Sequence, residues 1–283
     1  MNETILLNNN NLIPKEWFKQ PELLDDSDFI ESIKIFEKEI GQFPKDRYKN
    51  LEGIKKNHVF YFPTFLKETR NEKKIKILSS TIMIWLFIID QDFKKLKENN
   101  NLLKNQQKLL NILIDPTEKV PHDQQEKVTI VLKKLLKEIT GGNIFINNYF
   151  ITSVFNYISS IESTDGNKNS YLHIIDSCNL LQWIEIKKKR GECVLNSELL
   201  FLSDPRYIRL KNISNLLFSF ENETFSNIGG SYSNKTKIET LVGEFKQYED
   251  SLNSSYGFND CLLYMIKCLK YSVTGNILLK NNK

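Results

Sequence analysis

The chain has 283 residues, of which 40% are hydrophobic and 26% are charged, with a formal net charge of +4. This composition supports one sizeable core, so we predict a disordered polar tail over residues 1–14 and a single folded domain over residues 15–283. The small, dispersed charge gives no reason to expect a nucleic-acid partner. The longest apolar run, residues 82–89, is far shorter than the roughly 20 residues of a membrane span, and no secretion signal is evident. We therefore expect a cytoplasmic protein.

Apolar residues recur at the helical period along most of the chain, whereas strand-like alternation is almost absent. This pattern predicts an all-α fold. Proline and glycine breakers separate the segments, and Asp204 followed by Pro205 is typical of a helix start. The expected helices cover residues 26–40, 72–98, 102–114, 123–139, 144–162, 170–189, 204–226, 235–252 and 258–278.

Four cysteines lack the paired spacing of a zinc site, and the three histidines are scattered. We expect reduced, mostly buried thiols. Neither a P-loop nor a dinucleotide-binding glycine motif is present, so a nucleotide ligand is not predicted.

The predicted helix 72–98 turns from apolar to acidic near its end. Asp90 and Asp92 follow the apolar run, and Phe87 stands one turn before Asp90. Carboxylates in this position can hold a metal ion beside an apolar cavity, because the ion offsets the cost of partial burial. An ordinary helix end at the surface is the alternative interpretation.

The predicted helix 170–189 ends in a run of four cations, Lys187 to Arg190, followed by Gly191. Cations in this position can bind a diphosphate and stabilise its charge as it leaves. Two other interpretations remain open. Cations at a helix C-terminus are favourable by themselves, and a basic run can also be a nuclear-import signal.

Three oxygen-bearing side chains, Asn215, Ser219 and Glu223, are spaced four residues apart in the predicted helix 204–226. At about 100° per residue they spread over roughly 80° of one helix face, so they can converge on one cation. An amide, a hydroxyl and a carboxylate suit Mg²⁺ or Mn²⁺, which complete their coordination with water and substrate phosphates. A solvated polar stripe is the alternative interpretation.

These segments follow one another in a definite order, with an aromatic and acidic helix around Phe155 and Tyr157 between the acidic and basic helix ends. We expect Phe155 and Tyr157 to be core residues. The order and the N-x-x-x-S-x-x-x-E spacing resemble class I terpene synthases over nearly the whole chain from about Leu12. The match has departures: Gln91 and Leu216 replace the usual aspartates, and the chain stops without the family's C-terminal Arg-Tyr pair.

The interval from Gly191 to Asn215, 24 positions (215 − 191), is also shorter than in the family. We expect that a helical segment is missing there.

The resemblance implies a helical bundle around a central cavity, a prenyl diphosphate substrate such as farnesyl or geranyl diphosphate, and Mg²⁺ or Mn²⁺ as cofactor. Metal-dependent ionisation and carbocation rearrangement would then yield a terpene. The implied metal ligands are Asp90 and Asp92 on one wall and Asn215, Ser219 and Glu223 opposite. The implied diphosphate and substrate contacts are Lys187, Arg190, Gly191 and Phe87, with Asp90 and Lys187 as the catalytic residues.

Two alternatives stay open at this point. The motif departures are compatible with a degenerate member of the same fold that is weakly active or inactive. An all-α interaction protein that uses the basic run as a contact patch is the other possibility, and salt-sensitive binding of DNA or RNA that survives Glu223→Ala would support it.

Overall fold

A computed structural model describes residues 12–17, 30–31, 33–34, 37–38, 85, 102–115, 124–162, 171–224, 232–257 and 259–281. Every regular element in these ranges is a helix, as predicted. Contacts divide the chain into two compact units, one made of residues 22–190 and the other of residues 1–21 with 191–283. Of the predicted tail, residues 1–11 lie outside the described residues.

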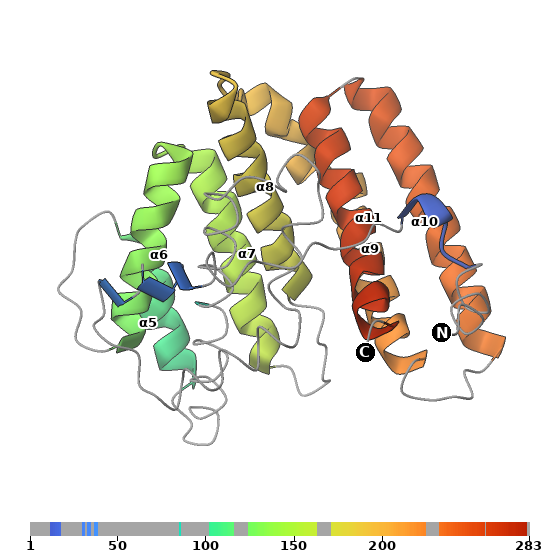
Figure 1. Cartoon of the computed structure of the whole chain (residues 1–283), viewed down its shortest axis with the longest axis horizontal. Helices are drawn as coiled ribbons and strands as arrows, with labels where there is room; N and C mark the ends of the chain where they lie inside the picture. The colour runs from blue at the N-terminus through green and yellow to red at the C-terminus, as the bar shows by residue number, and fades with distance from the viewer. Residues whose placement is uncertain are drawn as a thin grey trace. The chain divides into compact units, whose positions relative to one another are not determined.

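Within the unit of residues 22–190, the long helices among the described residues are α5 to α8. Helix α5 packs against α6 and α7, and α8 packs against α6 and α7. Figure 1 shows α6, α7 and α8 side by side. Predicted and observed boundaries agree to within one residue. The helices are α5 (Leu102–Ile114), α6 (Gln124–Thr140), α7 (Ile144–Glu162) and α8 (Tyr171–Lys189).

From residue 174 to residue 186, every side chain of α8 is buried, so this part of the helix is buried on all sides. Two polar contacts fasten it to α7: Tyr149 donates a hydrogen bond to the Asp176 carboxylate, and the Ser177 hydroxyl donates to Ser153 Oγ at 2.5 Å. Burial and the nearby Asp176 carboxylate raise the pKa of the Cys178 thiol well above its ordinary value. The hydrogen bonds from Tyr149 to Asp176 and from Ser177 to Ser153 fix the position of α8 along its axis relative to α7.

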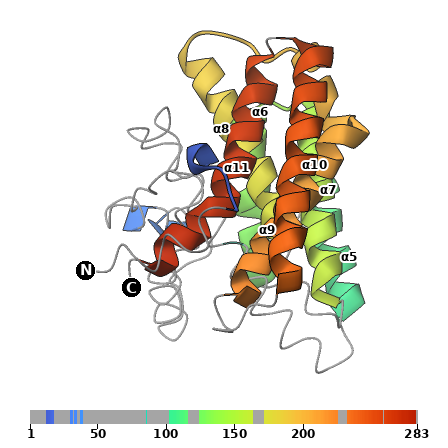
Figure 2. The same ribbon diagram turned by 90° about the vertical axis from the view of Figure 1, so that its right-hand side faces the viewer.

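The other unit is formed by the chain after residue 190 together with the short 3-10 helix η1 (Lys15–Trp17). Helix α9 packs against both α10 and α11, and η1 lies against α11 (Figure 2). The predicted boundaries fall within four residues of the observed ones. The elements are η4 (Asn196–Ser203), α9 (Pro205–Thr224), α10 (Tyr232–Tyr256) and α11 (Asp260–Asn281).

The cysteines are free thiols, three of them buried, as predicted. Phe155 is half exposed and is not a core residue, because it lies on the outward side of α7, whereas Tyr157 is buried as predicted. The predicted helix 26–40 is helical at its described positions, and of the predicted helix 72–98 only Trp85 is described.

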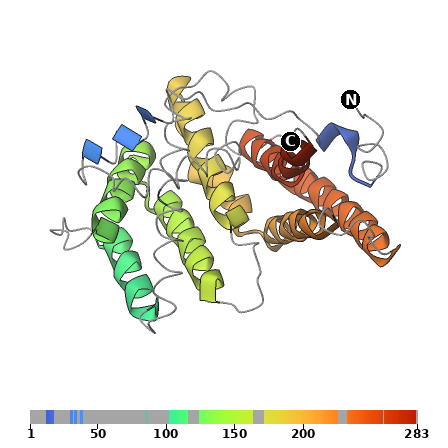
Figure 3. The same cartoon turned by 60° about the horizontal axis from the view of Figure 1, so that its bottom comes forward.

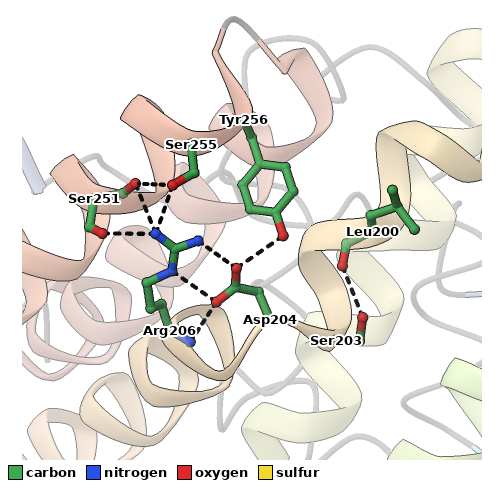
Figure 4. A network of polar contacts seen from close by, with 7 residues as sticks. All are labelled: Leu200, Ser203, Asp204, Arg206, Ser251, Ser255 and Tyr256. Atoms are coloured by element: carbon green, nitrogen blue, oxygen red, sulfur yellow. Dashed lines mark hydrogen bonds and ion pairs between the residues drawn. The ribbon is translucent and has the colours of Figure 1, made fainter.

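A network of hydrogen bonds connects the start of α9 with the end of α10 (Figure 4). Asp204 caps α9 as predicted: its carboxylate accepts a hydrogen bond from the backbone N–H of Arg206 at 2.8 Å, after Pro205 in the first turn. The Arg206 guanidinium binds the same carboxylate and donates to Ser251 and Ser255 on α10. Tyr256 donates to Asp204 at 3.0 Å.

This network predicts acid-sensitive stability. Hydrogen bonds from Arg206 lower the pKa of Asp204 to about 2, so its charged form stabilises the fold above the ordinary pKa near 4. That contribution is lost as the pH falls from about 4 to about 2. Asp204→Asn should lower the free energy of unfolding by about 1–2 kcal/mol at pH 7, and the deficit should shrink toward pH 2.5 in urea titrations.

The matched control is Glu244→Gln, which removes the acid of the partly exposed Arg209–Glu244 pair. Glu244→Gln should lower the free energy of unfolding by less than about 0.5 kcal/mol at pH 7. If Asp204→Asn lowers the free energy of unfolding by the same amount at pH 7 and at pH 2.5, the charge of the Asp204 carboxylate does not have the proposed role.

Candidate metal and diphosphate site

Helix α9 is continuous from Pro205 to Thr224, so Asn215, Ser219 and Glu223 belong to one helix at four-residue spacing. The backbone of α9 therefore places these three residues on one face of the helix, as expected. The structure describes the side chain of Asn215 but not those of Ser219 and Glu223. The Asn/Ser/Glu metal site itself thus remains a prediction.

Asn215 is buried, with 6% of its surface exposed. Its side-chain oxygen is buried and accepts no hydrogen bond from any residue that the structure describes. A buried carbonyl oxygen without a partner is costly, by about 1–3 kcal/mol, and therefore needs an explanation. The neighbouring Ser214 differs, since its hydroxyl donates to the Leu210 carbonyl of the same helix at 3.0 Å.

At the basic end of α8, Lys187 and Lys188 have different surroundings. The Lys187 ammonium lies 5.5 Å from the centre of the Trp183 ring, one turn earlier on the helix. Lys188 donates to the Glu138 carbonyl at the end of α6 and pairs with Glu185 at 3.6 Å. The ring beneath Lys187 was not assigned a role from the sequence, although an aromatic four residues before a lysine predicts such a contact.

Arg190 and Gly191 form the turn that ends α8. The Arg190 N–H donates to the carbonyls of Ile186 and Lys187, and the Arg190 side chain is exposed. Gly191 has a φ of 72°, in the left-handed region that glycine adopts without strain after a helix. A Cβ at Gly191 would meet nothing within 4 Å, so backbone conformation accounts for this glycine. Contact of either residue with a substrate remains a prediction.

The acidic wall falls outside the described residues, because Phe87, Asp90 and Asp92 are not among them. Within the described ranges, no three side chains of His, Cys, Asp or Glu come together as a metal-binding group. The basic end of α8 and Asn215 belong to different units. The metal and diphosphate site as a whole therefore remains a prediction.

The interval between Gly191 and α9 contains a helical element that the sequence did not predict. It is the eight-residue 3-10 helix η4, which buries Leu199, Phe201 and Leu202. The Phe201 ring packs edge-on against Tyr207 of α9 at 4.9 Å between ring centres. The segment between Gly191 and α9 is short, and the contact between Phe201 and Tyr207 packs it against α9.

Comparisons with known proteins address the fold directly. No protein-family model matches the chain, and no curated protein sequence matches it. Solved structures do match it, over nearly its whole length. The chain has the fold of class I terpene synthases. In the described part of the chain, no helix combines the length and apolar character that crossing a membrane requires.

Three of these structures illustrate the similarity. Germacradien-4-ol synthase from Streptomyces citricolor has a TM-score of 0.61 at 11% identity, covering 94% of this chain and 95% of that chain. Wild-type cucumene synthase has a TM-score of 0.58 at 13% identity, covering 96% and 99%. A variant of a protein from ancestral sequence reconstruction has a TM-score of 0.62 at 10% identity, covering 92% and 85%. At these identities the likeness establishes the fold alone.

Proposed function

We propose that the protein is a terpene synthase that ionises a prenyl diphosphate, such as farnesyl or geranyl diphosphate, with the help of a divalent metal ion. The observation that carries the proposal is the buried Asn215 oxygen, which has no partner among the described residues and belongs to a helix with Ser219 and Glu223 at four-residue spacing. The class I terpene synthase fold is consistent with it.

The residues on α9 fit Mg²⁺ or Mn²⁺. An amide oxygen, a hydroxyl and a carboxylate are hard donors, and a metal ligand would explain why the Asn215 oxygen is buried without a hydrogen bond. Asn215, Ser219 and Glu223 would hold one ion, and Asp90 with Asp92 would hold metal on the other wall. Bound metal would neutralise the charge that grows on the diphosphate as the allylic C–O bond breaks.

In this proposal, other side chains would bind the diphosphate, stabilise the carbocation and exclude water. Lys187 would hold the diphosphate through its ammonium, with Arg190 and Gly191 near the same end of α8. The ring of Phe87 would face the carbocation and stabilise it by cation–π attraction. Apolar side chains around the substrate would exclude water until a proton is lost or a water molecule is admitted.

The test is direct. Purified protein incubated with Mg²⁺ and farnesyl diphosphate should release a terpene that gas chromatography detects, and chelation of the metal should stop its formation. The runner-up is a degenerate member of the fold, which Gln91 and Leu216 favour. Absence of product with farnesyl, geranyl and geranylgeranyl diphosphate would reject catalysis and support that alternative.

The two neighbouring lysines give a matched pair for the diphosphate contact. Lys187→Ala should weaken inhibition by inorganic diphosphate about ten-fold, the loss expected for one charge-assisted hydrogen bond. Lys188→Ala should change it less than about two-fold, because Lys188 already binds the Glu138 carbonyl and Glu185. Equal effects in steady-state inhibition assays would indicate a diffuse basic patch without a dedicated contact.

A further inference from the structure

A pocket of about 380 Å³ lies between the end of α5, the middle of α6 and the start of α7. Figure 3 shows these three helices together. All the lining residues belong to the unit of residues 22–190. Half of the described lining residues are aliphatic, among them Ile112, Leu113, Ile130, Leu136, Ile144 and Ile151.

Two of the aliphatic side chains that line the pocket are largely exposed. Ile114 at the end of α5 is 62% exposed, and Ile144 at the start of α7 is 75% exposed. Covering exposed apolar surface in a concave site gains about 25 cal/mol per Å². Concave apolar sites of a few hundred Å³ are typical of small-molecule binding.

The pocket is also positively charged. Lys133, Lys134 and Lys137 on α6 line it, and among the described residues Asp115 is the one acid in its lining, so these residues carry a net charge of +2 (3 − 1). Lys133 donates to the backbone carbonyl of Asp115, and this bond holds its ammonium at the end of α5. Lys134 and Lys137 are exposed. Cations beside aliphatic walls match a ligand that has an anionic head and a hydrocarbon tail.

We propose that this pocket binds a small single-chain amphiphile with an anionic head group, such as a carboxylate or a phosphate monoester. The hydrocarbon tail lies among the isoleucines, and Lys134 and Lys137 bind the head. None of the described residues that line the pocket belongs to the proposed metal and diphosphate site. The inference therefore does not depend on the proposed function.

The experiment is a calorimetric titration of the full chain with decanoate, below the concentration at which decanoate aggregates. Divalent metal is left out, so that the proposed metal-dependent site does not compete. Decanol carries the same chain without the charge, and acetate carries the charge without the chain. Decanoate should bind at least ten-fold more tightly than either control compound. Equal binding of decanoate and decanol would overturn the assignment of the lysines.

Two pairs of variants test the residues. Lys134→Gln combined with Lys137→Gln should weaken decanoate binding about ten-fold. Lys104→Gln combined with Lys127→Gln removes the same charge from α5 and α6 outside the pocket, and should change binding less than two-fold. Equal weakening by both double variants would overturn the proposed head-group contact.

For the tail, Ile144→Ser should weaken binding about five-fold, since it removes apolar surface from the pocket. Phe155→Ser is the control, because Phe155 is an exposed apolar residue of the same helix outside the pocket. Far-ultraviolet circular dichroism checks that every variant retains its helices. Loss of decanoate binding in Lys187→Ala, with no loss in the Lys134 and Lys137 double variant, would place the ligand at the end of α8 and overturn the proposal.

Discussion

Replacement of Asn215 by alanine is expected to reduce Mg²⁺-dependent turnover of farnesyl diphosphate at least about 100-fold, which corresponds to about 2.7 kcal/mol of transition-state stabilisation. The fold should tolerate the change, because the Asn215 oxygen makes no hydrogen bond to a described residue that could be lost. Glu223→Ala should have a similar effect. Initial rates and circular dichroism, measured on the same preparations, separate the loss of turnover from a loss of helix.

The chain offers a matched control for this substitution. Asn253 on α10 also has a buried side-chain oxygen without a partner among the described residues. Asn253→Ala removes the same amide group from another helix and should leave turnover within about two-fold of the unmodified protein. Wild-type rates in Asn215→Ala and Glu223→Ala would remove the metal assignment, even if the protein makes a terpene.

Replacement of Trp17 by alanine should have the largest effect on stability. The indole is only 3% exposed and its ring centre lies 4.7 Å from that of Phe245 on α10. The Lys270 ammonium lies 5.7 Å from the centre of the indole ring, and Thr274 donates to the Trp17 carbonyl. Truncation of a buried tryptophan costs about 3–5 kcal/mol, and urea denaturation followed by circular dichroism would measure it.

Two further variants define the cause of that loss. Trp17→Phe keeps an aromatic ring beside Phe245 and should recover more than half of the stability. Lys15→Ala changes an exposed residue of the same short helix and should alter the free energy of unfolding by less than about 0.5 kcal/mol. An unchanged unfolding midpoint in Trp17→Ala would show that η1 contributes nothing to the stability of its unit.

Much of the fold could be predicted because the signals for helix ends are local. Asp204 and Pro205 start α9, and Gly191 ends α8, through capping and backbone preferences that each involve a few neighbouring residues. The 3-10 helix η4 was missed for a physical reason. It is short and irregular, and packing of residues such as Phe201 against α9 stabilises its conformation.

The candidate site could be predicted only in part. Four-residue spacing placed Asn215, Ser219 and Glu223 on one helix, because that depends on helix geometry alone. The burial of the Asn215 oxygen depends on tertiary packing, which the spacing does not reveal. The different surroundings of Lys187 and Lys188 likewise come from Trp183 and the end of α6. Four adjacent cations look alike in a sequence.

The distribution of the thiols has a practical consequence. Cys178, Cys261 and Cys268 are buried, and the raised pKa of Cys178 keeps it in the unreactive thiol form at neutral pH. Cys193 is exposed and lies in the segment that joins α8 to η4, two residues after Gly191, where the second unit resumes. A maleimide dye would therefore attach to the natural chain at this junction, and its fluorescence would report changes there when farnesyl diphosphate is added, without any engineered cysteine.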